Sequence, residues 1–373
     1  MVRPMTSAQS PNTGAPRSFD DLLAFDEFVL FGAGGGTHEV ESVLGDAGKR
    51  VIGYCDNSPA KQGQKFNGKP VFRPGELKTM MGPKRAIVIS AAYQSEIAAQ
   101  LTGDLGVERA RVFPFVSPMF RNHFGRRAVE PHLSAFEDLM GRLEDQESRD
   151  YLSALMRFRW TMDPADLRRN PKLAGFYHYK AAGLGPRKGD HIVDVGAYTG
   201  DTAQMYLERL SGDAHVSALE PLPRNLEAMA RTIEDSGLKD KVSIYPFAAG
   251  DAPGTAEIIS GAPVSDPRAT LRSADAPSRE TIRVETLDRL FLSGKRRVNF
   301  IKIDVEGFEP AVLAGGAQLI ARDKPGLALA LYHTPEQLFT LPAQLDRIAP
   351  GYRFYLGHHP SAPYECELFA SAD

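Results

Sequence analysis

The sequence predicts an α/β protein with two Rossmann-like domains, a smaller one followed by a larger one. Short apolar runs alternate with segments of helical length in both halves of the 373-residue chain, which is typical of parallel sheets with crossover helices. A glycine-rich turn follows the first strand of each half, at residues 32–36 and 196–200. Two final apolar runs, separated by a turn that contains proline, predict a hairpin and therefore one antiparallel strand in the mostly parallel second sheet.

These patterns divide the chain into four parts. We expect a disordered tail at 1–18, an N-terminal Rossmann-like domain at 19–118, a helical connector at 119–185 and the second Rossmann-like domain at 186–373. The connector is predicted from apolar residues at three- and four-residue spacing. The predicted strands are 27–31, 50–56, 70–72, 86–90 and 111–115 in the first domain, and 191–195, 216–220, 242–247, 300–304, 327–332, 352–356 and 365–369 in the second.

Composition excludes some partners. The net charge of -3 gives no general attraction to nucleic acid or to anionic membranes, and no apolar run reaches the roughly 18–20 residues of a membrane helix. The first 18 residues lack the apolar core of a signal peptide. Cys55 and Cys366, the only cysteines, cannot form a disulfide framework or a cysteine-based zinc site. We therefore expect a cytoplasmic protein with no nucleic-acid partner and no membrane span.

The most informative stretch is the turn after the first strand of the second half. Gly196 and Gly200 let a ligand approach the backbone closely, and the following helix presents free N–H groups. Glu220 lies 24 residues after Gly196 (220 − 196), at a strand end where a carboxylate accepts hydrogen bonds from ribose hydroxyls. A dinucleotide and S-adenosylmethionine both fit this pattern, but Tyr198 stands where the dinucleotide fingerprint needs a small residue. The predicted cofactor-binding residues are Asp194, Gly196, Ala197, Tyr198, Gly200, Asp201, Thr202, Glu220, Pro221, Asn225 and Ala248.

Four motifs, in this order, resemble one known family. They are the run 193–202 (VDVGAYTGDT), Glu220-Pro221, Thr286-Leu287-Asp288, and the run 301–309 (IKIDVEGFE) with Val312-Leu313 and Gly315. Together they resemble the FkbM family of S-adenosylmethionine-dependent methyltransferases over about residues 186–371. The resemblance implies a class I methyltransferase fold, S-adenosylmethionine as cofactor, and O-methylation of a sugar, a glycan or a polyketide-like hydroxyl. Tyr198 departs from the family, in which many members carry Asn.

Two strand ends carry the side chains that methyl transfer to an alcohol requires. Ligands bind outside the carboxyl ends of the strands in an open α/β sheet, and there Asp304 and Glu306 follow one strand and His333 the next. His333, whose ordinary pKa lies near neutrality, is the first candidate for the general base that removes the hydroxyl proton. Asp304 is the second, although it equally fits a helix N-cap, and His333 equally fits a partly buried, hydrogen-bonded histidine. We expect His358 and His359 to be exposed loop residues.

A metal ion is a further alternative. Asp304, Glu306 and His333 offer oxygen and nitrogen donors that could meet around Mg²⁺ or a transition ion, which would acidify the hydroxyl. No local spacing demands such an ion, so we expect transfer without a divalent metal and leave the site open. Lys302, in the middle of an apolar strand, either pairs with a carboxylate or extends to the sheet edge.

The N-terminal domain has a partial nucleotide-binding pattern. Gly32, Gly34 and Gly35 follow a strand, and Asp56 lies 22 residues beyond Gly34 (56 − 34), which suits a ribose-binding acid. Thr37 stands where the third glycine of the fingerprint would be. Residues 26–116 resemble, more loosely, the nucleotide-binding-type domain found before some sugar acyltransferases and sugar methyltransferases. Both a nucleotide site and a module for docking or dimerisation stay open.

Three functional hypotheses follow. The leading one is an O-methyltransferase whose partner is a small-molecule or glycan acceptor, including a nucleotide-linked sugar, with homo-oligomerisation left open. The second is an NAD-dependent oxidoreductase that uses the N-terminal turn, and the third is a nucleotide-sugar-binding regulatory protein without activity. Acceptor specificity is expected in the connector, in residues 260–280 and around His358, while Tyr177, His178 and Tyr179 either cover the pocket or pack as aromatic side chains.

Overall fold

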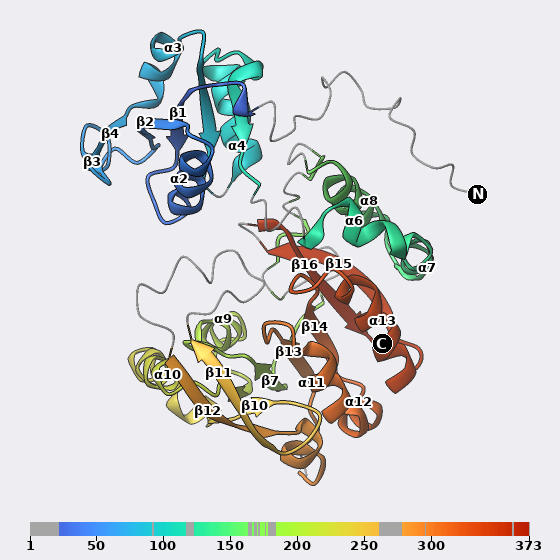
Figure 1. Ribbon diagram of the computed structural model, residues 1–373. Helices are drawn as coiled ribbons and strands as arrows, with labels where there is room; N and C mark the ends of the chain where they lie inside the picture. The colour runs from blue at the N-terminus through green and yellow to red at the C-terminus, as the bar shows by residue number, and fades with distance from the viewer. Residues whose placement is uncertain are drawn as a thin grey trace. The chain divides into compact units, whose positions relative to one another are not determined.

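The computed structural model describes residues 22–91, 93–116, 123–162, 166–167, 170, 172–175, 177, 184–260, 278–294, 296–359 and 362–372 (Figure 1). The chain divides into two compact units, one of Met1–Arg121 with Arg157–Asp166 and one of Asn122–Met156 with Leu167–Asp373. The tail expected at 1–18 and most of the segment 260–280 lie outside the described residues. Among the helices of the described residues, none has both the length and the apolar character needed to cross a membrane.

The first unit contains a six-stranded sheet in the order β3-β4-β2-β1-β5-β6. All neighbouring pairs are parallel except β3 and β4, which form an antiparallel hairpin. Its strands are β1 (Glu27–Phe31), β2 (Arg50–Cys55), β3 (Lys65–Phe66), β4 (Lys69–Phe72), β5 (Arg85–Ile89) and β6 (Val112–Pro114), and its helices include α2 (Thr37–Asp46), α3 (Leu77–Met80) and α4 (Gln94–Ala99).

Both faces of this first sheet are covered. Alternate side chains of a strand point to opposite faces, and on β1 Leu30 enters one apolar cluster while Val29 enters another. Both side chains are fully buried. Burial on two faces explains why the central strands read as continuous apolar runs rather than as an alternating pattern.

The second unit contains a seven-stranded sheet in the order β15-β16-β14-β13-β7-β8-β9. Strand β16 is antiparallel to both of its neighbours and the other pairs are parallel, so the predicted fold class and the single antiparallel strand are confirmed. The strands are β7 (His191–Val195), β8 (His215–Leu219), β9 (Val242–Tyr245), β13 (Phe300–Ile303), β14 (Gly326–Ala330), β15 (Arg353–His359) and β16 (Ala362–Ser371).

A second, three-stranded sheet was not predicted. It has the order β10-β12-β11 and consists of β10 (Ala248–Ala249), β11 (Gly254–Ser260) and β12 (Ser278–Glu285). Strands β11 and β12 form a long antiparallel pair, seen side by side in Figure 1. The two strands carry many polar and charged residues and few buried ones, so they show none of the apolar runs on which the prediction relied.

The first helices of the second unit precede its strands, and the later ones lie between the strands in sequence. They are α6 (Arg126–Val129), α7 (Leu133–Arg142), α9 (Asp201–Arg209), α10 (Pro223–Asp235), α11 (Glu309–Gly315), α12 (Ala317–Asp323) and α13 (Gln337–Ile348), while α8 (Gln146–Thr161) belongs to both units. Pro223 opens α10 at its first turn, where the missing N–H of proline costs nothing. Helices α7 and α8 occupy part of the span predicted as a helical connector.

Strand order locates the ligand-binding edge of the seven-stranded sheet. From β7 the chain continues to β8 and β9 on one side, whereas β13 and β14 lie on the other side. The order therefore reverses between β7 and β13, and ligands of open α/β sheets bind in the crevice at the carboxyl ends of such a pair. The turn after β7 and the loop after β13 form this crevice.

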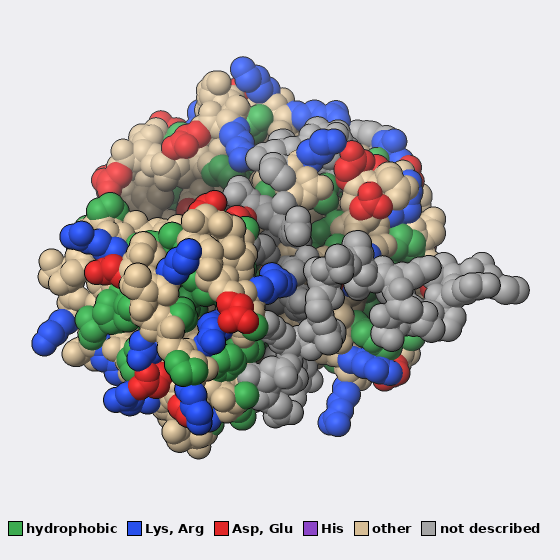
Figure 2. Space-filling view, turned by 90° about the horizontal axis from the view of Figure 1, so that it is seen from above, with side chains coloured by type: hydrophobic (Ala, Val, Ile, Leu, Met, Phe, Trp, Pro, Cys, Tyr) green, Lys and Arg blue, Asp and Glu red, His purple; other side chains and the backbone are tan. Residues whose placement is uncertain are grey.

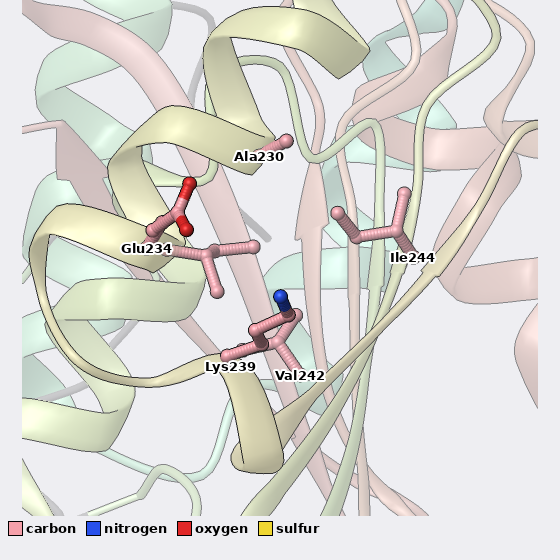
Figure 3. A pocket seen from close by; sticks show the side chains of 6 residues that line it. Ala230, Glu234, Lys239, Val242 and Ile244 are labelled. Carbon is pink, nitrogen blue, oxygen red and sulfur yellow. The ribbon is translucent and has the colours of Figure 1, made fainter.

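A separate cavity of about 380 Å³ lies between α10 and the edge strand β9. Figure 3 shows the side chains that line it, which are Ala230, Ile233, Glu234, Lys239, Val242 and Ile244. None of these is a predicted site residue, so the cavity is distinct from the crevice between β7 and β13.

Candidate active site

The turn after β7 is pressed against the loop after β13. Gly196 has φ +79°, and a Cβ added to it would lie 1.9 Å from the carbonyl oxygen of Asp304. Gly200 has φ +82°, and its added Cβ would lie 2.8 Å from Cγ of Met229. The sequence pattern predicts that a ligand approaches the backbone closely at these glycines. In the structure the close approach at both positions is to other parts of the protein: Gly196 contacts the loop after β13, and Gly200 contacts Met229 of α10.

Glu220 closes the turn from the end of β8. Its Oε2 accepts a hydrogen bond from the backbone N–H of Tyr198 at 3.1 Å, and its Oε1 accepts from the N–H of Leu222 at 2.9 Å and from Nδ2 of Asn225 at 3.1 Å. Burial raises the pKa of Glu220, while these hydrogen bonds act in the opposite direction. Tyr198 lies in the left-handed region at φ +47° with 47% of its surface exposed. The structure thus brings Tyr198, Glu220 and Asn225 together, and their role in cofactor binding stays a prediction.

The remaining predicted cofactor residues are more scattered. Ala197 is buried and Pro221 is half-buried next to Glu220. Asp201 and Thr202 open α9, with Asp201 exposed and Thr202 buried. Ala248 lies on β10, in the small second sheet rather than in the main one.

Asp194 and Lys302 form a buried ion pair between adjacent strands. Oδ1 of Asp194 lies 3.1 Å from Nζ of Lys302, and both side chains are at most 3% exposed. Lys302 also donates a hydrogen bond to the carbonyl oxygen of Gly196 at 2.7 Å. Burial would lower the pKa of Lys302, but Asp194 and Asp304 outweigh it and raise that pKa. The structure therefore settles the alternatives for Lys302: it pairs with a carboxylate.

Asp304 is held by hydroxyl groups on one side. Its Oδ2 accepts hydrogen bonds from the phenol of Tyr177 and from the phenol of Tyr332 at 3.0 Å. Burial would raise the pKa of Asp304, but Lys302, His333 and the two phenols outweigh burial and lower it. Asp304 is therefore a carboxylate at neutral pH. It does not act as a side-chain N-cap, since Phe308 occupies the N-cap position of α11.

His333 faces two carboxylates through one ring nitrogen and a third through the other. Nε2 lies 3.3 Å from Oδ1 of Asp304 and 3.4 Å from Oε2 of Glu306, while Nδ1 lies 2.9 Å from Oε1 of Glu309. The His333 side chain is 2% exposed and that of Glu306 is 54% exposed. Burial would lower the pKa of His333, but the hydrogen bond to Glu309 and the nearby carboxylates raise it to about 9. The three predicted catalytic residues are thus adjacent.

Glu309 is not among the site residues that the sequence predicts. Besides His333, its carboxylate accepts hydrogen bonds from the N–H of Val305 at 2.9 Å and from Nε2 of Gln337, and it is fully buried. It belongs to the one group of His, Cys, Asp and Glu side chains among the described residues that is arranged to hold a metal, together with Asp304 and His333. Glu309 lies five residues after Asp304 and is the first residue of α11. An acidic residue at the start of a helix next to the predicted site is the feature of the sequence that could have indicated it.

The expectation for His358 was wrong. His358 lies within β15 and is fully buried, and its Nε2 accepts a hydrogen bond from the backbone N–H of Asn170 at 3.0 Å. Strand β15 is longer than predicted and extends to His359. Pairing with the equally long β16 buries a histidine that the sequence places next to a turn.

In the N-terminal unit, Asp56 is engaged by the protein itself. Its Oδ2 accepts a hydrogen bond from the N–H of Ala33 at 2.9 Å and lies 3.0 Å from Nζ of Lys61, and its Oδ1 accepts from the N–H of Ser58 at 2.9 Å. Gly32 is in the left-handed region at φ +116°, whereas a Cβ added to Gly34 or Gly35 would meet nothing within 4 Å. Packing therefore requires glycine at position 32 but not at positions 34 and 35.

On the face shown in Figure 2, basic and acidic side chains are interspersed, and no large basic patch gathers there.

Comparisons with known proteins agree with this geometry. Residues 194–354 match the family model of the methyltransferase FkbM domain. The crystal structure of methyltransferase FkbM from Methylobacillus flagellatus KT shares 21% identity with a TM-score of 0.68, covering 92% of this chain and 89% of that chain. At this identity the likeness concerns the fold. No curated protein matches the sequence.

Two further solved structures resemble only part of the chain. Aeropyrum pernix fibrillarin with bound S-adenosyl-L-methionine shares 14% identity and covers 49% of this chain and 67% of that chain, with a TM-score of 0.30. Precorrin-6y C5,15-methyltransferase from Geobacter metallireducens GS-15 shares 12% identity and covers 57% and 96%, with a TM-score of 0.33. These scores are too low to bear on this chain. The family match, with the motifs and the strand order around it, identifies residues 194–354 as a methyltransferase domain of the FkbM family.

Proposed function

We propose that this protein transfers a methyl group from S-adenosylmethionine to a hydroxyl oxygen of a sugar, a glycan or a related small molecule in the cytoplasm. The observation that carries the proposal is the charge of the crevice. Among its described residues, the crevice holds two cations, Lys302 and the protonated His333, and a larger number of acidic side chains. The acidic side chains are Asp194, Glu220, Asp304, Glu306 and Glu309. An excess of negative charge in a partly buried crevice favours a cationic ligand.

The buried carboxylate of Asp194 supports the fit of this cofactor. Its Oδ1 is paired with Lys302 at 3.1 Å, but its Oδ2 has no hydrogen-bond partner within the described residues. Buried polar atoms without partners are rare and call for a ligand, a water or an ion. S-adenosylmethionine carries an ammonium and a sulfonium group, which suit such a carboxylate.

Each residue of the crevice has a proposed role. Asp194 faces the positive charge of the cofactor, Glu220 accepts hydrogen bonds from ribose hydroxyls, and the turn at Gly196 lies between them. When bound, S-adenosylmethionine supplies an electrophilic methyl group on a sulfonium. The acceptor hydroxyl loses its proton to the group formed by Asp304, Glu306 and His333, whose facing atoms lie 3.3–3.4 Å apart. Asp304, a carboxylate at neutral pH, is the candidate to receive the proton. His333, whose pKa is raised to about 9, is already protonated at neutral pH and holds Asp304 and Glu306 in place.

Replacing Glu220 by alanine is expected to weaken binding of S-adenosylhomocysteine by at least about tenfold, because a charge-assisted pair of hydrogen bonds is lost. Calorimetric titration of the full chain measures this affinity. Glu227→Ala, an exposed glutamate on α10, is the control and should leave it unchanged. NAD and a nucleotide-sugar are titrated in parallel. Binding of either in place of S-adenosylhomocysteine would move the function to the N-terminal domain.

Methyl transfer is expected to continue in EDTA. Glu309 already accepts several hydrogen bonds from the protein. Oδ2 of Asp304 accepts hydrogen bonds from two phenol groups. Few oxygen atoms are therefore left to coordinate a divalent ion. The assay is transfer of labelled methyl to a panel of sugars and nucleotide-sugars, before and after chelation. Activity that falls in EDTA and returns with Mg²⁺ or Mn²⁺ would contradict this expectation.

A further inference from the structure

Tyr177 reaches the candidate site from outside the span of the family match, which begins at residue 194. Its hydroxyl donates a hydrogen bond to Oδ2 of Asp304, 127 residues further along the chain. Its ring lies 5.0 Å from Nζ of Lys302, measured to the ring centroid, which is a favourable cation–π arrangement. One side chain therefore contacts two of the charged residues of the crevice.

The backbone of Tyr177 is held on both sides. Its N–H donates to Oε2 of Glu367 at 2.9 Å, and its carbonyl oxygen accepts from the hydroxyl of Tyr206 at 2.8 Å. Tyr177 is in the left-handed region at φ +50°, a conformation that non-glycine residues keep only when their surroundings enforce it. These two contacts, from β16 and α9, hold the backbone of Tyr177 in this conformation.

Within the described part of the chain, Glu367 has few other partners that explain its burial. It lies on β16 opposite Ala330 of β14 and is fully buried, and burial raises its pKa to about 8. Its second oxygen, Oε1, has no hydrogen-bond partner among the described residues. A buried carboxyl group is costly unless it makes strong hydrogen bonds. We attribute the burial of Glu367 to its hydrogen bond with the backbone N–H of Tyr177.

The consequence for Asp304 is a fixed orientation. Oδ2 receives hydrogen bonds from both Tyr177 and Tyr332, which leaves Oδ1 to face Nε2 of His333 at 3.3 Å. Rotation of the carboxylate would break both phenol contacts at once. Charge-assisted hydrogen bonds of this kind are strong enough to hold a side chain in one rotamer.

We propose that Tyr177 is a positioning residue of the methyl-transfer site: its hydroxyl orients Asp304 and moderates the charge of its carboxylate, and Glu367 holds Tyr177 in place. This inference rests on the proposed function. It assigns part of the site to a residue that precedes the methyltransferase domain and that the family motifs do not include.

The test compares the affinities of the full chain for S-adenosylmethionine and for S-adenosylhomocysteine by calorimetry. The two ligands differ by the methyl group and the sulfonium charge, so their affinity ratio reports the charge near the reacting methyl group and needs no acceptor. Tyr177→Phe keeps the ring but removes one donor from Asp304, so the carboxylate becomes less compensated. The ratio is expected to shift toward S-adenosylmethionine by about threefold or more.

Tyr352→Phe is the matched control. Tyr352 is also a buried tyrosine of the same unit, and its hydroxyl donates one hydrogen bond to the carbonyl oxygen of Pro325 at 2.7 Å. Loss of this hydroxyl should lower stability to a similar extent without changing the ratio. Tyr332→Phe removes the other phenol from Asp304 and should shift the ratio in the same direction as Tyr177→Phe, which keeps the test usable where one variant folds poorly.

The outcomes separate the two proposals. A ratio that stays at the wild-type value in both Tyr177→Phe and Tyr332→Phe, or that moves toward S-adenosylhomocysteine, overturns the positioning role alone. A wild-type protein that binds neither ligand overturns the proposed function and this inference with it.

Discussion

Replacing Gly196 by alanine is expected to lower the free energy of unfolding of the second unit by about 3 kcal/mol or more. Two effects add. Alanine is strained at φ +79°, and its Cβ would lie 1.9 Å from the carbonyl oxygen of Asp304, which is backbone and not a flexible side chain. The loops after β7 and β13 would have to separate, so binding of S-adenosylhomocysteine should be lost as well.

Gly212→Ala separates the backbone strain from the steric contact. Gly212 has φ +72°, but a Cβ added there would meet nothing within 4 Å, so only the backbone strain of about 1 kcal/mol applies. Urea unfolding of the full chain, followed by circular dichroism, gives the midpoint for each variant. Equal losses in Gly196→Ala and Gly212→Ala would show that the contact between the two loops is not tight.

Replacing Lys302 by methionine is expected to cost about 3–5 kcal/mol, because it leaves Asp194 as an unpaired buried charge. Lys302 and Asp194 are 3% and 0% exposed and lie 3.1 Å apart, so water cannot compensate for the lost partner. The carbonyl oxygen of Gly196 also loses its donor at 2.7 Å. Thermal and urea unfolding measure the loss.

Two further variants test whether the ion pair of Lys302 and Asp194 stabilises the protein. Lys172→Met removes a lysine that is 70% exposed and lies 3.5 Å from Glu147, and should cost less than about 1 kcal/mol. Adding Asp194→Asn to Lys302→Met removes the unpaired charge and should recover part of the stability. A Lys302→Met variant as stable as Lys172→Met would mean that the buried pair contributes nothing.

Local pattern was sufficient for the main strands and for part of the site. Apolar runs bounded by turn residues predicted every strand of the seven-stranded sheet to within a few residues, because burial on both faces leaves a clear mark in the sequence. The same positions placed Asp304, Glu306 and His333 at neighbouring strand ends. Parallel strands end at one edge, so residues that follow them meet there. The roles of these residues in catalysis stay predictions.

Strands made of polar residues, and contacts between residues far apart in the chain, could not be predicted from local sequence pattern. Strands β11 and β12 form a sheet outside the main core, so their residues need not be apolar. His358 lies next to a turn in sequence, yet pairing of β15 with β16 buries it. In both cases the pairing of strands, which local pattern does not encode, decided the environment.

By itself the sequence determined the fold class, the glycine turn with its acid at the next strand end, and the family to which residues 194–354 belong. Each of these can be recognised from residues that lie close together in the chain. Only the tertiary structure decided that Lys302 neutralises Asp194, that Gly196 is required by the carbonyl of Asp304, and that Tyr177 and Glu367 complete the site. These contacts join residues up to 190 positions apart, and their distances follow from packing, which no local spacing encodes.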